Sequence, residues 1–352
     1  MKLSLILLCL FPFIINAQNS DYSNYYTLIN KAEKRIFVDS AISDGLSIYL
    51  YAFNAYDFVF LTDCITAMQI ALYAKDENYF LKFSLKGFQN GLLPRHLSKI
   101  NYIKHNQQYV KNLDTLIEMY KRNRPAYFKR IDTITLKKMI SLYVNDQKFK
   151  NLQKNNVGID EKSYKLEIQK TISSLREIIT NKGFPTEKII GVDQNDIMKE
   201  LNLHNMDVYE YFNLFKRYYN VTHDQFIFDE RSFSSTYIFP IFHHYESSFG
   251  KYDLFEDSFY LAQILNGNLH PKDFAYINDI KYRVDETHKP NKQEMFFGGG
   301  WMDKQYLLLN DSIINKFRIR FFLPPIQQDR MKYGFMTKQG MWTYLGYMGT
   351  RI

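Results

Sequence analysis

The sequence predicts a mainly α protein, with repeat-like helical hairpins at its N-terminus and an α-rich C-terminal domain that contains minor β structure. Glycine (15) and proline (9) are scarce among the 352 residues, which disfavours a turn-rich β sandwich. Hydrophobic residues make up 46% and charged residues 23%, so the chain can bury a core and is not a disordered protein. A helical spacing of apolar residues, repeated four times between positions 25 and 92, is the third observation.

Residues 1–17 have the pattern of a secretory signal peptide. Lys2 is followed by an apolar run over 3–15, and Ala17 supplies the small residue at a cleavage site. We therefore expect cleavage after Ala17 and a periplasmic or secreted protein. The mature chain then keeps only Cys64, which excludes an internal disulfide, and the apolar helical stripe around Cys64 predicts a buried thiol.

The segment 18–93 is predicted to form two helical hairpins. Its four apolar quartets are Tyr25, Ile29, Ala32, Ile36; Ile42, Leu46, Tyr49, Phe53; Leu61, Ile65, Met68, Leu72; and Leu81, Leu85, Phe88, Leu92. Each quartet lies on one stripe of a helix, and Asp39-Ser40 is an expected N-cap for the second helix. The run 46–74 is long enough to span a membrane, but Asp57 and Asp63 near its middle favour two packed helices instead.

Within this region the chain resembles the tetratricopeptide-repeat class over about 21–93. The part 30–53 is similar to one helix pair and 67–88 to a second. The offsets between corresponding helices, 36 and 39 residues, depart from the usual period of about 34. The resemblance implies a concave surface for a protein or peptide partner, and a generic helical bundle is the alternative.

The segment 94–150 is predicted to be a pair of basic linking helices. Between 95 and 150 there are 13 lysines and arginines against 4 acids, a net charge of +9. Its apolar spacing is visible in Val110, Leu113, Ile117, Tyr120 and later in Leu136, Ile140, Tyr143. An exported protein does not meet nucleic acid, so an anionic envelope component is the sharper hypothesis for a partner here, and a solvated lysine-rich face is the plain alternative.

The C-terminal domain, 151–352, is predicted to be α-rich. Gly183 is expected to end a helix, Asn266-Gly267 another, and His270-Pro271 to open the next. The alternation of Phe317, Ile319 and Phe321 with arginines predicts a strand, and the last 20 residues are expected to form an extended tail.

About 133–305 also resembles an uncharacterised bacterial domain of exported proteins. The resemblance depends on Asp146-Gln147, Gly183-Phe184-Pro185, Ile190-Gly191 and His243-His244. The chain departs from the domain's pattern where an Asp-Arg pair is expected, since Asp279 is followed by Ile280. This resemblance implies no activity and assigns no catalytic role.

The candidate chemical residues are His243, His244 and Glu246. On a helical wheel the two histidines lie away from the apolar face of Phe242 and its neighbours. Imidazole and carboxylate groups are ordinary acid–base groups and ordinary zinc ligands, so His243, Glu246 and His270 are the candidate ligands of zinc or another divalent metal, with Asp253 as a distant donor. No HExxH motif is present, and surface or hydrogen-bonded histidines are the simpler interpretation.

The sequence therefore favours an exported envelope interaction or scaffold protein that binds a protein or peptide through its helical hairpins. No cofactor, no nucleic acid and no membrane span after signal cleavage are expected. The alternative is a hydrolase or metal-dependent enzyme with its site in the C-terminal half.

Overall fold

The computed structural model describes residues 21–154, 160–192, 194–203, 238–249, 254–280 and 311–344. Regular structure in these ranges is helical throughout, and they contain no strand. The mainly α class is therefore confirmed. The expected signal peptide and its cleavage site at Ala17 lie outside the described residues.

Four helices form the two predicted hairpins. They are α1 (Ser23–Phe37), α2 (Ile42–Ala55), α3 (Leu61–Tyr73) and α4 (Glu77–Gln89). Helix α1 packs against α2, and α3 packs against α4, so adjacent helices are paired as in a repeat. The apolar stripes of α1 and α3 are buried as predicted, and Cys64 is buried and free, with its thiol pKa raised by burial.

The start of α2 differs from the expectation. Ala41 occupies the N-cap position with no side-chain hydrogen bond, and Ser40 adopts a left-handed conformation with φ +57°. Asp39 does not cap the helix because its carboxylate pairs with Arg35 at 3.0 Å, four residues earlier on α1. In α4 the cap is conventional, since the Asp76 carboxylate accepts a hydrogen bond from the Tyr79 N–H.

The basic segment continues the helical layer. Three short helices, α5 (Pro94–Lys99), α6 (Asn101–Lys104) and α7 (Gln107–Lys111), lead into α8 (Leu113–Phe128), which packs on α4. Of the apolar spacing expected here, Leu136, Ile140 and Tyr143 are buried, whereas Val110, Leu113 and Ile117 are exposed. Tyr109, Leu116 and Tyr127 are buried instead, and the helix therefore turns a different stripe inward.

A second group of helices begins at α9 (Thr133–Lys154). It packs side by side with α10 (Glu161–Lys182), and α15 (Ile238–Phe249) packs on both. Because α9 is one continuous helix, it crosses the domain boundary expected at residue 150. Gly183 ends α10 with φ +87°, and a Cβ there would lie 2.4 Å from Asn268 Nδ2, which explains why the predicted helix stop is a glycine.

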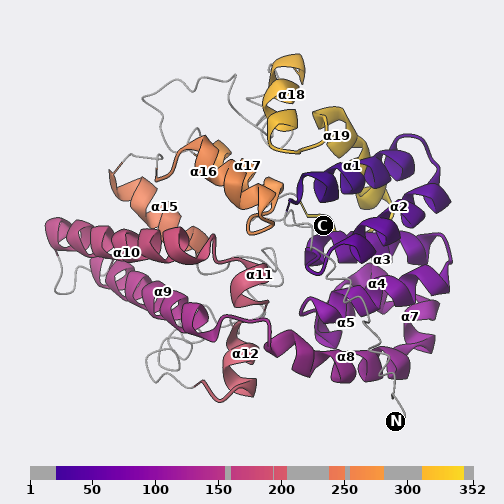
Figure 1. Ribbon diagram of the computed structural model, residues 1–352, viewed down its shortest axis with the longest axis horizontal. Coiled ribbons are helices and arrows are strands. Elements are labelled where there is room, and N and C mark those ends of the chain that lie inside the picture. Colours follow the sequence, from indigo (N-terminus) through magenta and orange to yellow (C-terminus); the bar gives the residue numbers. More distant parts are fainter. Residues whose placement is uncertain are drawn as a thin grey trace, which may run out of the picture.

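Short helices α11 (Glu187–Ile190) and α12 (Gln194–Glu200) lie between the two groups, and α16 (Asp257–Leu265), α17 (Pro271–Ile280), α18 (Asp311–Arg320) and α19 (Ile326–Lys338) lie across them (Figure 1). Asn266-Gly267 and His270-Pro271 end and open helices as predicted.

The strand predicted around Phe317–Phe321 is wrong, because these residues end α18. The alternation is misleading because Arg318 is the buried residue, paired with Asp329, whereas Ile319 is 64% exposed. The extended tail is also shorter than expected, because α19 continues to Lys338.

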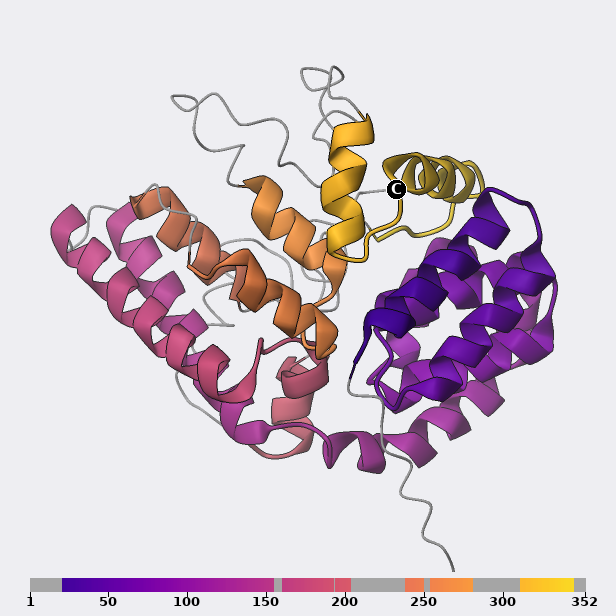
Figure 2. The ribbon, with the colours of Figure 1, turned by 45° about the horizontal axis from the view of Figure 1, so that its top comes forward.

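The two groups of helices form the arms of an open V, with α16 to α19 on its upper side (Figure 2). Helix α19 packs on α1, and the segment after it is fixed to α3. There the Gln69 amide donates to the Trp342 carbonyl at 2.9 Å and accepts from the Trp342 N–H at 2.8 Å. Within the described ranges, no helix has the length and apolar character that crossing a bilayer requires.

Candidate functional site

His244, a residue of the predicted site, forms a close pair with Asp146. Its Nδ1 lies 2.7 Å from Asp146 Oδ2, and the Gln147 amide donates to the same carboxylate oxygen at 2.9 Å. Asp146 comes from α9 and is 2% exposed, whereas His244 comes from α15. The packing of α15 on α9 thus joins two residues that are 98 positions apart in the chain.

The Asp146–His244 pair fixes which ring nitrogen carries the proton. A carboxylate accepts hydrogen bonds, so the Nδ1 that faces it is the protonated nitrogen and Nε2 keeps a lone pair. No partner of Nε2 occurs among the residues that the structure describes. A histidine held by a carboxylate on Nδ1, with Nε2 free, has the arrangement of a general base.

Two further polar atoms of this cluster are buried without a partner in the described part of the chain. They are Asp146 Oδ1 and the Tyr164 hydroxyl, which belongs to α10. Burial and then the negative charge of Asp146 raise the pKa of Tyr164 to about 12 against the opposing effect of Ser248 on α15, so its hydroxyl stays protonated at neutral pH. The Lys150 ammonium lies 5.7 Å from the centre of the Tyr164 ring.

The other predicted residues on α15 contribute less. The His243 ring is exposed, and its centre lies 6.2 Å from that of His244. The side chain of Glu246, like Asp253, lies outside the described residues. Across the described ranges, no three His, Cys, Asp or Glu side chains gather closely enough to hold a metal ion.

His270 lies in a different part of the molecule, at the start of α17. Its Nδ1 accepts the backbone N–H of Lys272 at 3.1 Å, and its Nε2 lies 3.7 Å from Asp63 Oδ1. Its ring is edge-on to those of Phe60 and Tyr344. With both nitrogens engaged and the ring enclosed, His270 caps α17 and does not join His243 and His244.

His270 borders a set of buried charges that sequence reasoning missed. Glu33 on α1 pairs with Lys332 on α19, and Asp329 pairs with Arg318 and, at 3.5 Å, with Lys272. The ionic cluster consists of Glu33, Asp63, Lys272, Arg318, Asp329 and Lys332. The one local signal was Glu33, which interrupts an apolar stripe of α1.

The ionic cluster keeps the carboxylates of Asp63 and Asp329 ionised despite burial. Burial alone raises the pKa of Asp329, but the charges of Lys272, Arg318 and Lys332 outweigh it and hold the pKa below its ordinary value. For Asp63, hydrogen bonds from His270 and from the Tyr25 hydroxyl likewise outweigh burial and lower the pKa. A cavity of about 20 Å³ beside Glu33, Asp63, His270 and Lys272 has room for a single water molecule.

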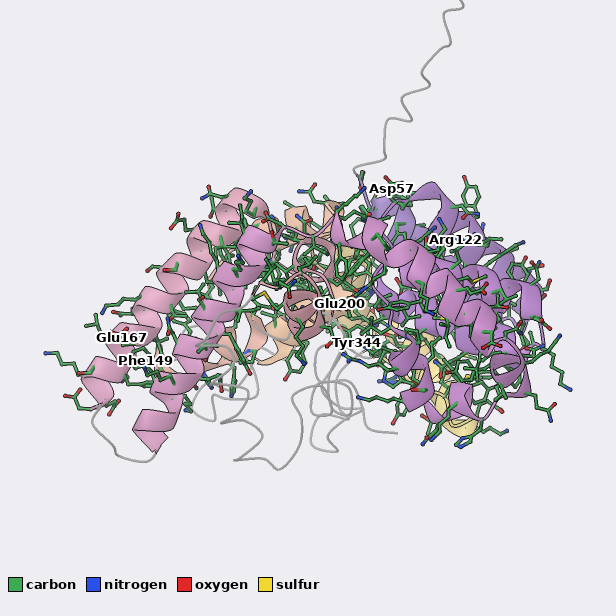
Figure 3. All side chains as sticks on the ribbon, turned by 90° about the horizontal axis from the view of Figure 1, so that it is seen from below. Asp57, Arg122, Phe149, Glu167, Glu200 and Tyr344 are labelled. Carbon is green, nitrogen blue, oxygen red and sulfur yellow. The ribbon has the colours of Figure 1, made fainter. Side chains whose placement is uncertain are left out.

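The apolar residues that α7 and α8 leave in solvent form a second candidate site. Val110 is 54% exposed and Leu113 and Ile117 are each 37% exposed, and we call these three residues the α8 row. The exposed cations on α6 to α8 are Lys104, Lys111, Lys121 and Arg122, and the exposed acids are Asp114 and Glu118. Lys111 is paired with Glu77 of α4 at 2.9 Å. Figure 3, which views the molecule from below, shows Arg122 on the outer side of the α1–α8 arm.

Comparisons with protein-family models, with curated proteins and with solved structures find no match to this chain. The structure supports paired adjacent helices in the N-terminal arm. No comparison supports the resemblance to tetratricopeptide repeats or to the exported bacterial domain.

Proposed function

We propose that the protein is an exported interaction protein of the bacterial envelope, and that its partner is a protein or peptide with an apolar, acidic surface. The α8 row carries this proposal. Three aliphatic side chains in solvent on neighbouring turns, bordered by an excess of cations, complement a partner of that chemistry.

The position of the C-terminal helices supports the choice of this surface. Helix α19 and the Trp342 segment already cover part of α1 and α3, so the chain itself occupies one face of the hairpins. The outer side of α7 and α8 has no such cover from the described residues. The repeat-like pairing and the expected signal peptide at 1–17 agree with an exported scaffold, periplasmic or secreted.

The proposal is tested by placing charges on the α8 row. The triple variant Val110→Glu/Leu113→Glu/Ile117→Glu should fold normally, because these residues are in solvent, and should lose the partner captured from an envelope extract. The matched control is Leu166→Glu, which changes an aliphatic residue that is 51% exposed on α10.

The captured partner, once identified and purified, should bind the wild type and the Leu166→Glu control equally and the triple variant at least tenfold more weakly. Equal binding of all three proteins would remove the α8 row from the proposal. Unlike deletion of 18–93, which would strip α4 from α8, these substitutions leave the packing of the arm in place.

A further inference from the structure

We propose that Asp146, His244 and Tyr164 form a hydrolytic site in which His244 activates water for attack on a carboxylic ester. This activity is independent of the α8 row. Asp146 on α9 and His244 on α15 meet at 2.7 Å, and the Tyr164 hydroxyl on α10 is close enough to Asp146 for that charge to raise its pKa.

His244 and His270 differ in how their ring nitrogens are bonded. His270 has both ring nitrogens engaged, one by a backbone N–H and one facing Asp63. His244 has a carboxylate on Nδ1 and, among the described residues, nothing on Nε2. A purely structural histidine has both nitrogens satisfied, whereas a base needs one that is free.

Unsatisfied burial of polar atoms is a second feature of the site. A buried polar atom without a hydrogen bond costs about 1–3 kcal/mol, so native proteins keep few of them. Here the carboxylate oxygen Asp146 Oδ1 is in this condition beside His244, and the Tyr164 hydroxyl lies near Asp146 and Ser248. A substrate or water that fills the site would supply the missing partners.

Each of the three side chains has a role in the hydrolysis. His244 Nε2 takes a proton from water while the water oxygen bonds to the acyl carbon. Asp146 holds the ring and stabilises the imidazolium that forms. The phenol of Tyr164, which stays protonated, donates to the oxyanion. The bond to the leaving alcohol then breaks, and His244 returns the proton to its oxygen, giving the acid and the alcohol.

Hydrolysis of para-nitrophenyl acetate by the full mature chain is the first test. General acid–base catalysis contributes about 10²–10⁴-fold, so His244→Gln and Asp146→Asn should each lower kcat/KM about 100-fold or more. His105→Gln, which changes an exposed histidine on the other arm, should leave the rate within about twofold. A wild-type rate no higher than that of equimolar free imidazole would overturn the proposal, as would an unchanged rate in His244→Gln.

The protonation state of the two His244 ring nitrogens distinguishes a general base from a histidine with a purely structural role. Nitrogen NMR of the wild type should show His244 protonated on Nδ1 and unprotonated on Nε2, and Asp146→Asn should shift the proton toward Nε2. A wild-type His244 already protonated on Nε2 would exclude it as the base. Circular dichroism and thermal unfolding of each variant establish that these comparisons are made on folded protein.

Discussion

At the scale of single residues, two histidines with similar burial have opposite roles. His270 caps α17 and packs among aromatic rings, whereas His244 exposes one nitrogen beside a carboxylate. The sequence made His244 a candidate acid–base residue and His270 a candidate metal ligand of the same site. Local pattern could not separate them, because the partner of His244 is 98 residues away and that of His270 lies on α3.

This difference predicts different stability effects. Replacing His270 with alanine removes the acceptor of the Lys272 N–H, leaves Asp63 with the Tyr25 hydroxyl but without the imidazole, and opens a gap beside Phe60. It should therefore lower the free energy of unfolding by about 2–4 kcal/mol. His244→Gln should cost less than about 1 kcal/mol, because glutamine can still donate to Asp146. Urea denaturation measures both, and a larger loss in His244→Gln would reverse the assignment.

The buried Glu187 should make the free energy of unfolding depend on pH. Burial raises its pKa well above the ordinary value, and its carboxyl accepts the Leu61 N–H at 3.2 Å. The folded protein holds this proton while the unfolded chain releases it above about pH 4.3, so Glu187 lowers stability as pH rises from there.

Glu187→Gln keeps an acceptor for Leu61 and removes that titration. The variant should therefore gain stability over the wild type between pH 4 and pH 7, measured by denaturation at each pH. Parallel stability curves for the two proteins would show that Glu187 ionises normally in the fold.

At the scale of elements, apolar periodicity predicted where helices form better than it predicted which face of each helix is buried. The quartets of α1 and α3 face the core, but the spacing of Val110, Leu113 and Ile117 marks a solvent face. The alternation of apolar residues with arginines in α18 indicated a strand because the sequence does not show that Arg318 is buried and Ile319 exposed. Arg318 can be buried only because Asp329, on the next helix, neutralises it.

Arg124 on α8 holds α12 through its ion pair with Glu200. Its guanidinium lies 4.4 Å from the centre of the Phe128 ring and 5.1 Å from that of Tyr127, and it pairs with Glu200 at 2.7 Å. Arg124→Ala should lower stability by about 1–2 kcal/mol and raise amide hydrogen exchange in α12 more than in α10. Uniform exchange along the chain would mean that this contact does not anchor α12.

At the scale of the whole molecule, the C-terminal helices close on the first hairpin. Figure 3 shows Tyr344 near the middle of the molecule, between the two arms. Its hydroxyl donates to Asp273, and Lys332 on α19 pairs with Glu33 on α1. No local pattern predicts these contacts, because the two residues of the first are 71 positions apart and those of the second 299 positions apart.

A double-mutant cycle on Glu33 and Lys332 tests this closure. Glu33→Gln or Lys332→Met alone leaves one buried charge unpaired and should cost about 3–5 kcal/mol. The double variant should cost clearly less than the sum of the two, because neither charge remains. Additive losses would indicate that the two side chains do not interact in the folded protein.

The central claim is that a partner binds on the α8 row, and site-specific photocrosslinking in living cells tests it most directly. A photoreactive residue at Ile117 should give a discrete protein adduct in the envelope, and one at Leu166 on the other arm should give none. Leu166 is 51% exposed and Ile117 37% exposed, so a lower accessibility of the control position would not explain an adduct found at Ile117 alone. An adduct at Leu166 with none at Ile117, or no adduct at either, would contradict the account.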